Sequence, residues 1–219
     1  MTNMRYLFEP QSIAVIGASY DTAKIGYKVL ENIVLSSYLH KVYPINPRGG
    51  EILGLQVFKT LEDINEPIDL AFIVIPAKLV FDAVKRCAEK GVKIALIITS
   101  GFSEVGNIQE EKNIATYARE HGLRILGPNI FGIYSAIASL NATFGTRDVR
   151  KGNVAIITQS GALGASMIGK TAVENIGISA MVSVGNKADI DESDLLEYLI
   201  TQDMTKIVFM YVEGVREGE

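Results

Sequence analysis

Two stretches of small residues, 17–19 (Gly-Ala-Ser) and 160–164 (Ser-Gly-Ala-Leu-Gly), have the composition of a phosphate-binding turn. Each follows a short, unbroken apolar run, at 13–16 and at 154–157, and precedes apolar residues at helical spacing. This order predicts a buried parallel strand, a tight turn and the start of a helix. Because a helix N-terminus offers unpaired N–H groups and the positive end of the helix dipole, both stretches are predicted anion sites.

The residues around the first turn favour a ligand that carries several phosphates. The turn keeps only the first glycine of the Gly-x-Gly-x-x-Gly fingerprint of dinucleotide sites. The second expected strand ends at Asn46, Pro47 and Arg48, not at the acidic residue that would hold a ribose. Arg48, with Lys24 and Lys41 nearby in the sequence, suits a phosphate better than a ribose diol. Coenzyme A (CoA), with a pyrophosphate and a 3′-phosphate, fits this pattern; NADP fits it partly, and a purely structural turn is the third alternative.

Ligands of parallel α/β sheets bind outside the carboxyl ends of the strands. A single glycine or proline at a strand end is an ordinary turn residue, but the concentration of several at one sheet edge favours a binding site. The residues predicted to contact CoA are Gly17, Ala18, Ser19, Lys24, Gly26, Asn46, Pro47, Arg48, Ile75, Pro76, Thr99, Ser100, Gly101 and Asn129.

The second turn would hold orthophosphate or a phosphoryl group through its N–H groups and the Ser160 hydroxyl. The next two expected strands end at 185–187 (Gly-Asn-Lys) and at Glu213, which brings polar groups to the same edge. Two alternatives stay open, because Ser160 alone is typical of a helix N-cap and Glu213 alone is typical of a solvated loop acid. The acidic residues of 189–194 are interpreted as a solvated helix start without a chemical role.

Alternating strand and helix patterns predict the framework that carries these turns. They indicate an α/β protein that begins with a Rossmann-like parallel sheet covered by helices on both faces. The expected strands lie at 12–17, 41–45, 70–75, 93–99 and 124–126, and the expected helices at 25–36, 78–90 and 108–121.

Residues 134–152 interrupt the alternation with a polar, glycine-containing stretch, and we predict a connector there. The alternation then restarts, which predicts one domain at 1–145 and a second at 146–219. A second sheet of only three strands would leave an unpaired edge, so we expect the chain to be part of a larger protein or assembly. The expected strands of this part lie at 154–157, 179–184 and 206–212, and the expected helices at 165–175 and 192–201.

Composition and charge exclude several classes of function. The net charge of −4 does not favour nucleic acid or an anionic membrane, and 48% hydrophobic residues support a folded core. The apolar runs are too short to span a bilayer, and the first ten residues have no signal-peptide pattern. The single cysteine, Cys87, permits neither an internal disulfide nor a cysteine metal cluster. We expect a cytoplasmic protein without a metal site.

Seven motifs, collinear over nearly the whole chain, resemble the NDP-forming acyl-CoA synthetases. The most similar branch is the ADP-forming acetate–CoA ligase, related to the alpha subunit of succinyl-CoA synthetase. The motifs are SIAVIGAS at 12–19, VYPINP at 42–47, GPN at 127–129, LNATF at 140–144, QSGALG at 159–164, VGNKAD at 184–189 and YVEG at 211–214.

The resemblance implies a CoA-binding domain at 1–145 followed by the start of a flavodoxin-like ligase domain at 146–219. In this family a phosphoryl group moves between an acyl phosphate, an enzyme histidine and a nucleoside diphosphate. The overall reaction converts acyl-CoA, phosphate and NDP to acid, CoA and NTP. The resemblance further implies that Ser160 and Gly161 face the phosphate. It also implies that Glu213 accepts a hydrogen bond from the imidazole of the phosphorylated histidine and so orients it.

Two departures from the family pattern shape the expected partners. The family's phospho-accepting histidine follows the Glu-Gly motif, and neither it nor the nucleotide-grasp portion falls within these 219 residues. We therefore expect the chain to bind CoA or acyl-CoA as part of an oligomer. ADP or ATP with Mg would bind only to a separate nucleotide-grasp domain or subunit. Ile130 stands where the family often has cysteine, a change that CoA binding should tolerate after repacking.

Two other functions remain open at this point. One is a non-catalytic CoA or acyl-CoA sensor, or the regulatory module of a fused acyltransferase. The other is an NADP-dependent reductase, which the absent second and third fingerprint glycines disfavour.

Overall fold

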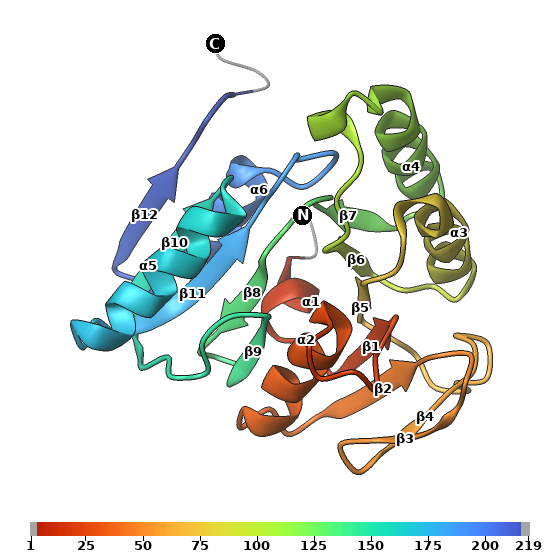
Figure 1. Ribbon diagram of the computed structural model, residues 1–219. Coiled ribbons are helices and arrows are strands. Elements are labelled where there is room, and N and C mark those ends of the chain that lie inside the picture. Colours follow the sequence, from red (N-terminus) through yellow and green to blue (C-terminus); the bar gives the residue numbers. More distant parts are fainter. Residues whose placement is uncertain (1–3, 216–219) are drawn as a thin grey trace.

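The computed structural model describes residues 4–215, which form two five-stranded sheets lying side by side (Figure 1). The first sheet is parallel throughout and has the strand order β2-β1-β5-β6-β7. The chain leaves β1 toward β2 on one side and later enters β5 on the other. The crevice beyond the carboxyl ends of β1 and β5 is therefore where such sheets bind ligands. The strands are β1 (Ser12–Ile16), β2 (Lys41–Ile45), β5 (Leu70–Ile73), β6 (Ile94–Ile97) and β7 (Arg124–Leu126).

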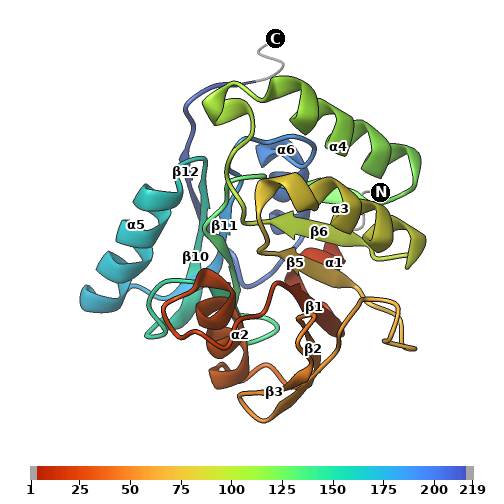
Figure 2. The same cartoon turned by 45° about the vertical axis from the view of Figure 1, so that its right-hand side comes forward.

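Helices cover both faces of this sheet, as the alternating pattern predicts (Figures 1 and 2). Ile13 and Val15 belong to the core on the α2 side with Val29, whereas Ala14 packs on the opposite side with Val84 of α3. A small antiparallel hairpin, β3 (Gly50–Ile52) and β4 (Leu55–Val57), follows β2. The helical segments are α1 (Arg5–Phe8), α2 (Ile25–Leu35), η1 (Ala77–Leu79), α3 (Val80–Glu89), η2 (Ser103–Val105) and α4 (Ile108–Glu120). Within residues 4–215, no helix has the length and apolar character needed to cross a membrane.

The second sheet is mixed and has the order β12-β10-β11-β8-β9. Strands β12, β10 and β11 are parallel, whereas β8 and β9 extend the sheet in antiparallel fashion. These two strands occupy part of the stretch for which the sequence predicts a connector, so that prediction is wrong for 134–135 and 140–143. The elements are β8 (Gly132–Ser135), β9 (Leu140–Thr143), β10 (Lys151–Thr158), α5 (Gly161–Val173), β11 (Ile178–Ser183), α6 (Glu192–Leu199) and β12 (Ile207–Tyr211).

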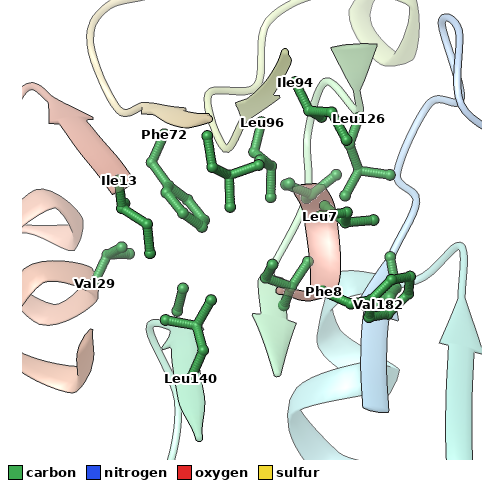
Figure 3. Close-up of a cluster of buried hydrophobic side chains, with 14 of the residues drawn as sticks. Leu7, Phe8, Ile13, Val29, Phe72, Ile94, Leu96, Leu126, Leu140 and Val182 are labelled. Atoms are coloured by element: carbon green, nitrogen blue, oxygen red, sulfur yellow. The ribbon is translucent and has the colours of Figure 1, made fainter. Parts of the chain in front are cut away.

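One hydrophobic core connects the two sheets. Figure 3 shows Leu7 and Phe8 of α1 between Leu126 of the first sheet and Val182 of the second. The ring of Phe8 also stacks on Tyr198 of α6, with ring centroids 4.7 Å apart. Because these side chains are buried against both sheets at once, neither sheet has a separate core on this side.

Backbone hydrogen bonds join the sheets near the ligand-facing edge. The N–H groups of Asn186, Ala188 and Ile190 donate to the carbonyl oxygens of Pro128, Gly127 and Ile125, at 3.0, 2.8 and 2.9 Å. Gly185 approaches Pro128 so closely that a Cβ at this position would collide with the Pro128 carbonyl oxygen. The loops after β7 and β11 therefore lie in direct contact.

Asp189 anchors the same junction electrostatically. Its carboxylate accepts hydrogen bonds from Arg124 Nε at 2.7 Å, from Arg119 at 3.2 Å and from the Ile125 N–H at 2.9 Å. The Asp189 side chain is only 4% exposed. The predicted solvated character of 189–194 is thus wrong for this residue.

Replacing Asp189 with alanine should lower the free energy of unfolding by about 3 kcal/mol. The change removes the acceptor of Arg124 Nε and of the buried Ile125 N–H and leaves Arg124 with Asp194 as its ion-pair partner. Removing one member of a buried ion pair is costly. Urea denaturation followed by far-UV circular dichroism measures this loss. Asp148→Ala, in an exposed loop, is the matched control and should be nearly neutral. Equal stability of the two variants would contradict the anchoring role.

Candidate functional site

A pocket of about 600 Å³ lies where the edges of the two sheets meet. It brings together two groups of residues that the sequence assigns to different sites. Ser100 and Asn129 come from the first sheet, and Ser160, Gly161 and Glu213 come from the second. The sequence reasoning missed its apolar wall, because that wall is assembled from separate segments with no shared motif. It consists of Ile25, Ile98, Ile130, Phe131, Phe144, Ala162 and Ala165.

The glycines of the first turn allow neighbouring backbone segments to pack closely. Gly17 has φ +94°, and a Cβ there would collide with the Val74 carbonyl oxygen. Gly26 is buried, and a Cβ there would meet the Gly17 carbonyl oxygen, so it lets α2 approach the turn as the last glycine of a dinucleotide fingerprint does. Ala18 is buried and Ser19 half-buried beside them.

The amides of the first turn are used differently from the sequence expectation. The Gly17 N–H donates to the Ile45 carbonyl at 3.0 Å and the Ala18 N–H to Val15 at 3.4 Å, so both are taken by the protein. Helix α2 begins later, after the exposed Lys24. Within residues 4–215 no acceptor is seen for the N–H groups of Ile25 and Gly26. The anion-facing amides of this turn are therefore those of the helix start.

The loop after β2 is tied to the loop after β1. The Asn46 side-chain amide donates to the Ala18 carbonyl at 2.7 Å, and its oxygen accepts the Arg48 N–H at 3.0 Å. The Arg48 guanidinium lies 4.6 Å from the centre of the Tyr20 ring, and the Tyr20 hydroxyl donates to Gly49. Arg48 is thus exposed but held beside the first turn. Lys41 lies elsewhere, because it starts β2 at the opposite edge and pairs with Glu66.

A second pocket of about 440 Å³ lies at the carboxyl ends of β1, β2 and β5. Gly17, Pro47 and Ile75 line it, as the sequence places them at neighbouring strand ends. Arg86 and Leu79 also line it, and the sequence reasoning did not select them. They come from the helical segments after β5, where no local motif distinguishes a lining residue from an exposed one.

The ends of β5, β6 and β7 are linked by side-chain hydrogen bonds. The Thr99 hydroxyl donates to the Ile75 carbonyl at 2.6 Å. Asn129, at φ +62°, donates its N–H to the Thr99 carbonyl at 3.0 Å and its side-chain amide to Asn186 at 3.3 Å. Asn129 therefore connects the first sheet with the second. Pro76 is exposed, immediately before η1.

Glu104 stabilises the loop after β6 through hydrogen bonds to its carboxylate. Its carboxylate accepts the N–H groups of Gly101 and Phe102 and the side-chain amide of Asn186, the last at 2.6 Å. Partial burial alone would raise the pKa of the Glu104 carboxyl, but the hydrogen bonds from Gly101, Asn186 and Phe102 together lower it below its ordinary value. The loop that carries Ser100 and Gly101 is thus held by an ionised carboxylate.

The second turn forms a helix N-terminus that opens into the larger pocket. Helix α5 begins at Gly161, four residues earlier than the pattern predicts, and Ser160 is its N-cap. The Ser160 hydroxyl accepts the Leu163 N–H at 3.3 Å, which is the N-cap alternative considered from the sequence. Within the described residues, the N–H groups of Gly161 and Ala162 have no acceptor, and both residues line the pocket. These two amides could hold an oxyanion.

Glu213 follows the edge strand β12 and is exposed at the rim of the same pocket. Its N–H donates to the side-chain oxygen of Gln159, which precedes the N-cap of α5. Lys187 and Glu192 form a buried ion pair beside them, at 3.1 Å with side chains 9% and 12% exposed. The prediction of a solvated helix start is therefore wrong for Glu192 as well.

Comparison with known proteins places the chain in a family. Residues 11–136 match the family described as "CoA binding domain". The chain belongs to this family. Residues 151–219 match a second family, described as "Succinyl-CoA ligase like flavodoxin domain". The predicted boundary between 145 and 146 stays a prediction, since β8 and β9 pair with the second sheet although they precede residue 145.

Several relatives are named as ADP-forming acetate–CoA ligases, and this chain matches their CoA-binding portion. The alpha subunit of acetate–CoA ligase [ADP-forming] I from Pyrococcus furiosus is 47% identical over 99% of this chain and 48% of its own length. The acetate–CoA ligase [ADP-forming] of Methanocaldococcus jannaschii is 46% identical over 98% of this chain and 30% of its own. The chain thus spans half or less of the length of these relatives.

A solved structure shares the fold closely. It is an acetyl-coenzyme A synthetase of Candidatus Korarchaeum cryptofilum in complex with phosphate and ADP. It has a TM-score of 0.97 and 48% sequence identity, and the match covers 100% of this chain and 47% of that one. The expected Rossmann-like domain followed by a flavodoxin-like portion is confirmed.

Glu104→Gln should flatten the acid dependence of stability. Because the folded state lowers the pKa of Glu104 below its ordinary value of 4.5, it binds fewer protons there than the unfolded state does. The carboxylate thus contributes stability above about pH 4.5, and this contribution is lost as the pH falls through the folded-state pKa. Urea midpoints measured from about pH 6 to pH 3 should fall more steeply for the parent chain than for the variant. Glu51→Gln, in the exposed hairpin, should follow the parent, and parallel curves for Glu104→Gln would contradict the assignment.

Proposed function

We propose that this chain provides the CoA-binding and phosphate-facing part of an ADP-forming acyl-CoA synthetase of the acetate–CoA ligase type. The whole enzyme would convert acyl-CoA, phosphate and ADP to acid, CoA and ATP through an acyl phosphate and a phosphohistidine. The observation that carries the proposal is the pocket of about 600 Å³ between the sheets, because residues expected at CoA and residues expected at phosphate line it together.

On the CoA side, the ligand would lie along the carboxyl edge of the first sheet. The smaller pocket between Gly17, Pro47 and Ile75 has a mainly apolar lining and suits the adenine end. Lys24, Arg48 and the N-terminus of α2 supply positive charge for its phosphates. Ser100 and Asn129 then line the route into the larger pocket, where the thiol end would reach the reacting groups.

On the phosphate side, the amides of Gly161 and Ala162 would hold the phosphoryl oxygens. Negative charge at a helix N-terminus is favoured by the dipole as well as by the unpaired N–H groups. In this arrangement Ser160 stabilises the helix start and does not itself need to react. Glu213, at the rim, is positioned to accept a hydrogen bond from an imidazole that enters the pocket.

The histidine and the nucleotide would come from a further domain or subunit of nucleotide-grasp type. Supporting this, the curated relatives are about two to three times as long as the matched region. ADP or ATP and Mg would bind in that part. The alternative of a sensor or regulatory module is not favoured, since relatives that are 47% and 48% identical to this chain are named as ligases.

The primary experiment is binding of CoA by the 219-residue chain. CoA should raise the thermal unfolding midpoint and NADP should not, because only a ligand that binds the native state stabilises it. By calorimetric titration, Arg48→Ala should weaken CoA binding roughly tenfold through loss of a charge-assisted phosphate contact. Arg150→Ala, exposed before β10, is the matched control and should bind as the parent does. Stabilisation by NADP alone would overturn the CoA assignment.

Gly161→Pro should weaken binding of inorganic phosphate while leaving the fold intact. Proline at the first position of a helix deletes one N–H without breaking a helical hydrogen bond. Ser160 already has the extended backbone that a following proline requires, and a Cβ at Gly161 would make only ordinary contacts with Phe131. Gly161→Ala keeps the N–H and is the matched control. Phosphorus NMR titration measures both variants, and equal phosphate affinities would remove this amide from the site.

A further inference from the structure

The segment that carries Glu213 is held by side chains and not by the sheet. Strand β12 lies at the sheet edge, and its last paired residue is Tyr211, opposite Thr158. The Gln159 N–H still donates to the Tyr211 carbonyl at 3.1 Å, but residues 212–215 are outside the strand. The direction of Glu213 must therefore be set by other contacts.

Gln159 supplies these contacts with both ends of its carboxamide. Its oxygen accepts the N–H groups of Glu213 at 2.8 Å and of Gly214 at 3.2 Å. Its nitrogen donates to the Gly214 carbonyl at 2.8 Å and to the Glu192 carboxylate at 2.6 Å. Gln159 is buried, so these bonds are formed in a partly dehydrated place where an unpaired polar group is costly.

Lys187 also donates a hydrogen bond to the Gly214 carbonyl. Its ammonium donates to the Gly214 carbonyl at 2.6 Å and to Glu192 at 3.1 and 3.2 Å. Glu192 lies in the first turn of α6, which fixes it relative to the second sheet. The Gly214 carbonyl thus accepts two donors, and both donors are themselves held by one buried carboxylate.

We propose that Gln159 is a positioning residue for Glu213, with Lys187 and Glu192 as its support. The inference rests on the proposed function, in which Glu213 accepts a hydrogen bond from an imidazole. Such an acceptor is effective when its direction is fixed before the partner arrives, because ordering it later would oppose binding. A buried ion pair such as Lys187–Glu192 adds little to the free energy of folding, because taking both charges out of water is costly. We therefore assign this pair to fixing one geometry of the segment.

The test uses free imidazole as the probe and the full 219-residue chain as the protein. Nitrogen-15 NMR of labelled imidazole gives its affinity for the parent chain and for Glu213→Gln, Gln159→Leu and the double variant. Gln202→Leu is the matched control, because within residues 4–215 the Gln202 side chain hydrogen-bonds only to the neighbouring Thr201. Circular dichroism and CoA stabilisation of each sample show that the fold and the CoA site are retained.

Glu213→Gln should weaken imidazole binding about tenfold, and Gln159→Leu by roughly 2- to 10-fold. In the double variant the loss should equal that of Glu213→Gln alone, because Gln159 acts only through Glu213. A merely structural role for Gln159 would not produce this coupling. Gln159→Asn, which keeps both the acceptor oxygen and the donor nitrogen of the carboxamide, should restore part of the binding lost in Gln159→Leu. It also serves as the second variant if the leucine variant does not fold.

The outcomes distinguish the positioning role of Gln159 from the proposed function. Unchanged imidazole affinity in folded Gln159→Leu, with a loss in Glu213→Gln, overturns the positioning role and leaves the proposed function intact. Fully additive losses in the double variant overturn it as well. Imidazole binding that is absent in the parent chain, or insensitive to Glu213→Gln, removes the role of Glu213 itself and with it the inference. If CoA does not raise the thermal unfolding midpoint of the parent chain, that result would instead contradict the proposed function.

Discussion

The contact between the loops after β7 and β11 is the constraint on which the site depends. Three backbone hydrogen bonds, the close approach of Gly185 to Pro128 and the buried Asp189 all act within a few residues of each other. Together with the core around Leu7 and Phe8, they hold the ligand-facing edges of the two sheets at one separation. The larger pocket is a product of that separation, since neither sheet forms it alone.

Polar groups near the pocket fall into two sets. The first set is used up by the protein: the Gly17 amide, the Thr99 hydroxyl and the Ser160 hydroxyl each bond to a neighbouring loop or helix end. The second set, at the starts of α2 and α5, has no acceptor among the described residues. This division follows from helix geometry, because the first N–H groups of a helix have no partner within it. The turn amide and the side-chain hydroxyls thus hold the loops together, and the N–H groups at the two helix starts are left for the proposed ligands.

Much of the fold could be predicted from sequence because its signals are local. The apolar runs at 13–16 and 154–157 are buried strands, and the small residues after them are the tight turns. The elements β8 and β9 were missed because Asn141 and Thr143 give the stretch a polar appearance. In the fold both are buried, and the Asn141 side chain accepts hydrogen bonds from Thr143. A polar residue satisfied by its neighbours cannot be told from a loop residue by composition.

The site was predictable at strand ends and unpredictable elsewhere. Parallel topology brings Asn129 to the carboxyl edge of the first sheet and Ser160 to that of the second. Phe131 and Phe144, by contrast, reach the pocket through packing between distant segments. The acidic stretch at 189–194 was misinterpreted for a related reason. Whether Asp189 is solvated or buried depends on Arg124, which lies 65 residues away in the sequence.

The capping of α5 also sets the stereochemistry available to a bound oxyanion. The Leu163 N–H donates to the Ser160 hydroxyl, and the Ser160 N–H donates to the Thr158 hydroxyl, so this helix start presents two free donors in place of four. A tetrahedral anion docked on Gly161 and Ala162 can satisfy these donors with one or two of its oxygens. In the proposed function, its remaining oxygens would face outward, on the side away from the helix.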